Sequence, residues 1–262
     1  IITGGAAADT ITGNGGADTI TGGAGDDIIT GGTGNDIITV DAGKDTVLDL
    51  GGSGGSESDV VIVNSGATLD ATGIAGFTAT NVTTNKSTDA TKATLTAKAD
   101  AAVTIDVSGA KSDSNGWTLV GGSGTGDDVL KGGAAADIIT GGAAADTITG
   151  NGGADTITGG AGNDIIDAGN GADTIVIATA GEADGDTIDG GGHSDVLKLA
   201  TGGTDTFSTD NKLVSIETLT LNASGSTVTY EYDKATWMGR IFFGAWILGL
   251  QATVYELCQL RL

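Results

Sequence analysis

The chain has 262 residues, of which 48 are glycine and none is proline, and its formal net charge is −23. Aromatic residues make up only 4% of the chain, so a conventional globular core of large side chains is not expected. No basic stripe is present that could neutralise nucleic-acid phosphates. A single cysteine, Cys258, excludes an intramolecular disulfide framework.

A repeat array occupies residues 1–50. From Gly4 to Leu48 the chain divides into five blocks of nine residues, GGAAADTIT, GNGGADTIT, GGAGDDIIT, GGTGNDIIT and VDAGKDTVL. The sixth place is always aspartate and the eighth is always a large aliphatic residue. These aspartates are Asp9, Asp18, Asp27, Asp36 and Asp45. Because Ile1 stands in the middle of a repeat, we expect the true N-terminus to lie upstream.

Residues 51–122 have a different composition, dominated by threonine, alanine and valine. Alternating runs such as DVVIV (59–63), ATLTAKA (93–99) and AVTIDV (102–107) predict strands. Trp117, beside a glycine-rich turn, is expected to pack in the core. This segment is expected to continue or brace the repeat structure as irregular β layers.

A second array occupies residues 123–198. Six blocks run from Ser123 to Val176, and after a four-residue insertion two degenerate copies cover 181–189 and 190–198. Residues 1–25 recur letter for letter at 138–162, which indicates a duplicated gene segment. The sixth-place aspartates are Asp128, Asp137, Asp146, Asp155, Asp164 and Asp173, followed by Asp186 and Asp195 in the degenerate copies.

The C-terminal part divides into a predicted β extension, 199–236, and an apolar tail, 237–262. The apolar run IFFGAWILGL (241–250) has ten residues, too few for the ~20 that span a bilayer, so no transmembrane span is predicted. Three interpretations of the tail remain open. It could cap the end of the repeat structure, be a foreign or out-of-frame tail, or anchor the protein at a membrane interface.

Each nine-residue block is typical of a tight loop followed by a very short strand. Glycines allow the loop to curl, and the β-prone triplet that follows turns its middle residue to one face. One aliphatic residue cannot be buried by nine residues alone, but stacked copies form a continuous apolar column. The sequence therefore predicts an all-β parallel solenoid.

Stacking also places aspartate over aspartate, near the ~4.8 Å spacing of neighbouring strands. Carboxylates so close repel one another by roughly 1 kcal/mol per pair even in water. A hard divalent cation between them removes this repulsion, and Ca²⁺ prefers the carboxylate and carbonyl oxygens that such loops offer. The sequence therefore predicts several bound calcium ions, with Mg²⁺ disfavoured by its stricter geometry.

The blocks resemble the nonapeptide G-G-x-G-x-D-x-U-x of the RTX (repeats-in-toxin) proteins, and Gly22 to Thr30 fits it at every place. The resemblance implies a right-handed parallel β-roll in which two blocks make one coil and calcium lies between coils. It pairs Asp9 with Asp27, Asp18 with Asp36, Asp27 with Asp45, Asp128 with Asp146, Asp137 with Asp155, Asp146 with Asp164, and Asp155 with Asp173. Loop carbonyls such as those of Gly13, Gly15, Gly22 and Ala24 would complete the sites. Ala7, Ala135 and Ala144 depart from the family's fourth-place glycine, so weaker calcium sites are expected there.

No catalytic constellation is visible in the sequence, so an enzyme is not predicted. His193 is the only histidine and is expected to be solvated. The match of Gly51–Ser53–Gly55 to a nucleophile motif lies in a glycine- and serine-rich turn and is interpreted as chance.

Three functions are therefore weighed. The first is a calcium-dependent structural module of a secreted bacterial S-layer-type protein, because the mixture of RTX blocks with Thr/Ala-rich segments resembles such surface proteins. Its expected partners are other copies in a lattice and cell-surface polysaccharide, with no nucleic acid. The second is the calcium-folded module of an exported enzyme or toxin, and the third is an adhesin stalk. The resemblance further implies export of the unfolded chain through a one-step secretion channel and folding outside, where calcium is abundant.

Overall fold

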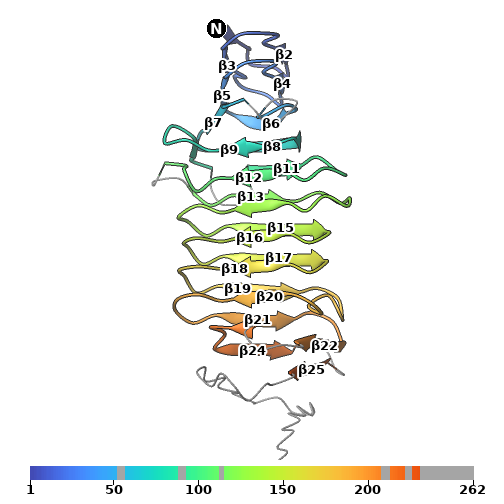
Figure 1. Ribbon diagram of the computed structural model, residues 1–262. Coiled ribbons are helices and arrows are strands. Elements are labelled where there is room, and N and C mark those ends of the chain that lie inside the picture. Colours follow the sequence, from blue (N-terminus) through green and yellow to red (C-terminus); the bar gives the residue numbers. More distant parts are fainter. Residues whose placement is uncertain (52–56, 88–92, 112–114, 208–212, 222–225, 231–262) are drawn as a thin grey trace, which may run out of the picture.

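The computed structural model describes residues 1–51, 57–87, 93–111, 115–207, 213–221 and 226–230, which form one tall stack of parallel strands (Figure 1). No helix occurs among these residues, so the described part of the chain contains no helix that could cross a membrane. The predicted all-β parallel solenoid is confirmed. The apolar tail, 237–262, lies outside the described residues.

One side of the stack is a continuous sheet of eleven parallel strands that runs through both arrays and the segment between them. In spatial order its strands are β2 (Thr10–Thr12), β4 (Ile28–Thr30), β6 (Gly43–Val47), β8 (Ala67–Ile74), β11 (Ala93–Ala97), β13 (Thr118–Val120), β15 (Ile138–Ala143), β17 (Thr156–Ala161), β19 (Thr174–Ile177), β21 (Val196–Leu199) and β24 (Thr218–Leu221).

The other side is divided between two sheets. The five-stranded sheet contains β1 (Ile2–Thr3), β3 (Thr19–Thr21), β5 (Ile37–Val40), β7 (Val60–Val63) and β10 (Thr84–Asn85). The seven-stranded sheet contains β23 (Leu213–Val214), β20 (Thr187–Asp189), β18 (Ile165–Asp167), β16 (Thr147–Thr149), β14 (Val129–Lys131), β12 (Thr104–Asp106) and β9 (Phe77–Thr78). A separate pair consists of β22 (Gly203–Phe207) and β25 (Ser226–Tyr230).

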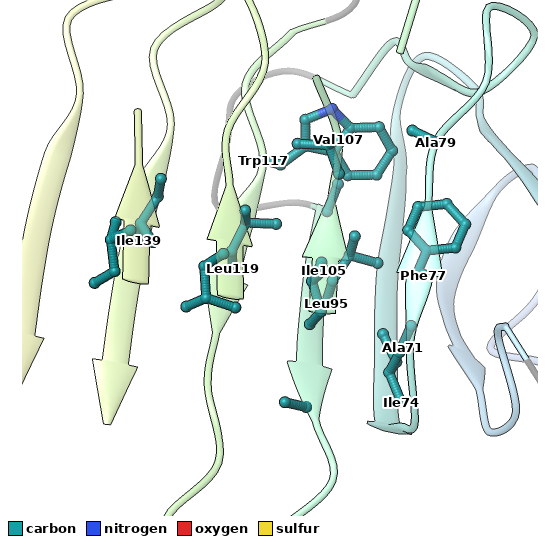
Figure 2. Packing of buried hydrophobic residues seen from close by; sticks show 14 of the residues in the cluster. Ala71, Ile74, Phe77, Ala79, Leu95, Ile105, Val107, Trp117, Leu119 and Ile139 are labelled. Carbon is teal, nitrogen blue, oxygen red and sulfur yellow. The ribbon is translucent and has the colours of Figure 1, made fainter. Parts of the chain in front are cut away.

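The core is a set of aliphatic columns between the two sides. Strand pairing places Leu95, Leu119 and Ile139 one above another, each fully buried, and Figure 2 shows them between the sheets. The eighth-place residues of the arrays continue the same columns in both directions. Each buried aliphatic contributes about 1.5–3 kcal/mol. Trp117 is 1% exposed, which confirms its expected place in the core.

The segment between the arrays forms wider coils of the same solenoid. Val47, Ala71, Leu95 and Leu119 pair in successive strands at spacings of 24 residues, whereas Ile11, Ile29 and Val47 are spaced by 18. The extra length contains β9 and β10, which lie on different sheets. Because β10 ends the five-stranded sheet and β9 begins the seven-stranded one, the second side of the stack changes here.

Candidate metal sites

The sixth-place aspartates form ladders along the edges of the stack. In each ladder, the carboxylate Oδ1 of one aspartate accepts a hydrogen bond from the backbone N–H of the aspartate one coil earlier. The N–H of Asp155, for example, donates to Oδ1 of Asp173 at 2.8 Å. The ladders are Asp9–Asp27–Asp45, Asp18–Asp36–Asp59, Asp128–Asp146–Asp164–Asp186 and Asp137–Asp155–Asp173–Asp195–Glu217.

Every aspartate pair that the resemblance implies is therefore brought together. In the degenerate copies, Asp186 pairs with Asp164 and Asp195 pairs with Asp173. Coordination itself is a separate matter and depends on the second carboxylate oxygen, Oδ2. In eight aspartates this oxygen is buried and has no hydrogen-bond donor. They are Asp27, Asp36, Asp45, Asp146, Asp155, Asp164, Asp173 and Asp195. We call the loops that end at these residues open loops.

Other loops supply a donor to Oδ2 from their own backbone. Gly5 N–H donates to Oδ2 of Asp9, and Gly133 N–H to Oδ2 of Asp137, both at 2.6 Å. Gly122 N–H serves Asp128 in the same way at 2.6 Å. Both oxygens of these carboxylates thus have protein partners, and we call these loops closed.

The backbone conformation at the second place separates seven of the eight open loops from the closed loops; the exception is the loop of Asp45, where Asp41 has no positive φ. In seven open loops the second residue has a positive φ, and its N–H makes no bond to the aspartate. These residues are Gly23, Gly32, Gly142, Asn151, Gly160, Gly169 and Gly191. Gly5 and Gly133 of the closed loops do not have a positive φ. The loops with Ala7 and Ala135 at the fourth place are closed, whereas Ala144 takes φ +84°, a strained conformation for alanine, and its loop stays open.

First-place glycines are required because the aspartate and the next coil both approach their α-carbon. A methyl group on Gly150 would stand 2.5 Å from Oδ2 of Asp155 and 2.3 Å from the carbonyl oxygen of Ala168. The orphaned carboxylate oxygen and a loop carbonyl of the next coil therefore lie side by side. The same holds for Asp146 Oδ2 and the carbonyl of Gly159 around Gly141.

The four loop carbonyls named from the resemblance have different positions. That of Gly22 lies beside Asp9, since both would contact a methyl group on Gly4. Gly15 and Ala24 form bridges to Thr33 and Ala42 in the next coil. Gly13 donates its N–H to the carbonyl of Thr30 at 2.9 Å, and the structure does not place its carbonyl beside an aspartate.

Burial raises the pKa of several of these carboxyl groups. Burial, together with the negative charges of its ladder neighbours Asp137 and Asp173, raises the pKa of Asp155 to about 8. Burial likewise raises the pKa of Asp146 to about 7. The pKa of Asp137 rises less, to about 6, because the N–H groups of Trp117 and Gly133 both donate to its carboxylate.

The structure adds acidic residues that sequence reasoning missed. Asp59 continues the ladder of Asp36, 23 residues later, and its own Oδ2 accepts from Gly51 N–H. Glu57 binds the N–H of Gly34, and its Oε2 is buried without a partner. The sequence carried a signal for Asp59, since GGSESDVVI (54–62) has aspartate at the sixth place and valine at the eighth. Glu217 ends another ladder by accepting a hydrogen bond from Asp195 N–H at 2.7 Å. A search for aspartate at the sixth place does not find it, because it is a glutamate.

The residues of the open loops fit a calcium ion. Each offers a buried carboxylate oxygen without a donor next to backbone carbonyls, which is the oxygen-only donor set that Ca²⁺ prefers. Among the described residues no three carboxylate, imidazole or thiolate side chains gather into one group that could hold a metal. Backbone carbonyls would therefore supply most ligands of a calcium ion held by an open loop. His193 is exposed, as expected, with Nδ1 2.7 Å from the carbonyl oxygen of Gly192.

Comparison with known families agrees with this chemistry. The family model of the RTX calcium-binding nonapeptide repeat matches the chain in four copies, over residues 1–29, 12–47, 120–157 and 140–175. Both arrays therefore contain copies that match the RTX calcium-binding nonapeptide repeat. No curated protein matches the chain. The matched ranges contain most of the open RTX loops, but the RTX-like ladder positions at Asp59, Asp186, Asp195 and Glu217 lie beyond them.

Proposed function

We propose that this chain is the calcium-dependent structural module of a secreted bacterial surface protein of the S-layer type, which folds and self-associates when calcium binds. The row of buried aspartate oxygens without donors carries the proposal, because charged groups so placed destabilise the fold unless a cation joins them. The Thr/Ala-rich coils support a structural role, since they lengthen the solenoid without adding a catalytic group.

We assign calcium to the open loops and not to the closed loops. In a closed loop the backbone N–H already occupies the oxygen that would bind the ion. In an open loop the calcium ion would supply the positive partner that this negatively charged oxygen lacks. The closed loops at Asp9 and Asp137 would then stack by hydrogen bonds alone.

Asp155→Asn and Asp137→Asn are expected to differ in calcium content. Asparagine keeps an oxygen for the ladder bond, but it replaces Oδ2 by an NH₂ group, which repels a cation. Asp155→Asn should therefore lose at least one calcium per chain, counted by elemental analysis of the dialysed protein. Asp137→Asn should keep the full count, although loss of the Gly133 bond lowers its stability by about 1–3 kcal/mol. An equal loss of calcium in both variants would contradict the assignment.

A second candidate is the calcium-folded secretion module of an exported enzyme or toxin. The RTX match itself favours it, because proteins with such repeats are typically secreted. A chain that cannot fold without calcium would stay extended in the cytosol, where calcium is scarce, and would fold outside. In this candidate the active part belongs to another region of a longer protein.

Electron microscopy of negatively stained protein separates the two candidates. A surface-layer module should form two-dimensional arrays in millimolar calcium and none in chelator, because like charges then keep the chains apart and unfolded. Single, well-separated rods at high protein concentration in calcium would favour the secretion module instead.

A further inference from the structure

The eleven-stranded sheet presents an uncharged outer surface over five consecutive strands, β11 to β19. The ten residues that flank the buried central residue of each strand are all β-branched, and none is charged. We call this surface the neutral face; it consists of Thr94, Thr96, Thr118, Val120, Ile138, Thr140, Thr156, Thr158, Thr174 and Val176. Their side chains are exposed or half-buried. For a chain of net charge −23, a surface without charge is unusual.

The opposite side of the same coils is different. The outward residues of β12, β14, β16, β18 and β20 include Asp106, Lys131, Asp167 and Asp189. Lys131 and Asp106 form an ion pair at 3.2 Å. Because the repeats on the two sides have the same pattern, the lack of charge on one side is not a consequence of the repeat itself.

Charged residues border the neutral face at both ends. On β8, three strands before the central strand β15, Asp70 pairs with Lys44 at 3.2 Å and keeps a third of its side chain exposed. On β21, three strands after β15, Lys198 points outward and has no ion-pair partner among the described residues. A partly exposed aspartate that is shared with Lys44 and an unpaired lysine therefore lie at equal distances on either side of β15.

We propose that the neutral face binds the neutral face of a second copy of this chain, with the order of strands reversed about β15. This arrangement brings Lys198 of each copy toward Asp70 of the other. The inference rests on the self-association in the proposed function and adds the surface that performs it. A partner with the same repeat matches the strand spacing of about 4.8 Å along the whole contact, because both surfaces have one period. A self-complementary patch of this kind closes as a two-fold dimer.

The charge distribution suits such a pair, and the area limits its strength. The acidic ladders lie at the loop edges, so only the strand face lets two copies approach without strong repulsion. Reversal about β15 overlaps the nine strands from β6 to β24, which at about 4.8 Å apart and about 10 Å wide bury roughly 430 Å² per copy. This area is below that of a stable specific interface and suits a weak one. We therefore expect a concentration-dependent dimer.

The test compares two pairs of substitutions within identical Thr-Ile-Thr triplets. Thr156→Glu with Thr158→Glu places charge on the neutral face, and Thr147→Glu with Thr149→Glu places it on the opposite side, with the same burial pattern. In analytical ultracentrifugation of the calcium-loaded chain, the first pair should weaken the dimer at least about tenfold, because a buried unpaired charge is costly. The second pair should leave it unchanged. Circular dichroism of each variant in calcium checks that the solenoid is folded.

Lys198→Glu tests the reversed order. It should weaken the dimer in the original chain and have no effect when Asp70 is already Asn, since interacting residues show such coupling. Equal effects in both backgrounds would overturn the arrangement.

Association that survives the neutral-face variants, for example through the apolar run 241–250, would overturn the face proposal and leave the proposed function standing. A monomer in calcium that still forms arrays would do the same, whereas a monomer without arrays would remove both.

Discussion

Removal of calcium is expected to unfold this chain almost completely at pH 8. Eight buried carboxylate oxygens have no donor in the folded chain, and an uncompensated buried charge costs several kcal/mol. Their sum exceeds the ~5–15 kcal/mol by which a typical domain is stable. Far-UV circular dichroism should show β structure in millimolar calcium and a disordered spectrum after chelation with EGTA.

Magnesium serves as the control for this experiment. It carries the same charge but demands near-octahedral geometry and keeps its water, so an equal concentration should not restore the β spectrum. Identical spectra in calcium and in EGTA would contradict the prediction, because the open loops would then be stable without a cation.

Metal-depleted protein is expected to regain β structure when the pH is lowered from 8 to 5.5. Folding raises the pKa of Asp137, Asp146 and Asp155 to about 6, 7 and 8, above the ~3.9 of an unfolded aspartate. Between about pH 4 and pH 8 the folded chain therefore binds more protons than the unfolded chain. Its stability is greatest below about pH 4 and is lost as the pH rises through 6 to 8. Protonation neutralises the ladders where no calcium does.

Calcium should reverse the sign of this dependence. Protons compete with the cation for the same oxygens, so the calcium-loaded chain should become less stable as the pH falls. Melting temperatures from pH 5 to 8, with and without calcium, should give two curves of opposite slope. Parallel curves would show that the buried aspartates do not govern stability. The range stops above the sequence pI of about 4.1, where the uncharged chain would precipitate.

The repeats made the fold predictable in the arrays. A period of nine, with aspartate at the sixth place and an aliphatic residue at the eighth, determines both the apolar columns and the ladders. Ile139 over Ile157 and Asp137 beside Asp155 are therefore found where the pattern puts them. Stacking of identical units leaves the chain little choice, because each block buries its aliphatic residue only against the next.

Prediction failed where the period is broken. Asp59 lies 23 residues after Asp36 and Glu217 lies 22 after Asp195, so neither follows the 18-residue coil. Strand pairing absorbs the added residues by extending the loops or, between the arrays, by inserting β9 and β10 on different sheets. Only the register of the strands shows which acidic residue meets which.

The sequence by itself thus determined the all-β solenoid, its aliphatic core and the aspartates of both arrays. The tertiary structure alone decided which loops are open, because this depends on the backbone angle φ of the second loop residue. Gly133 has no positive φ and closes its loop by donating to Asp137, whereas Gly142, in the same GGAAAD context, takes φ +117° in an open loop. Identical local sequence cannot distinguish them, and the coils stacked on either side provide the difference.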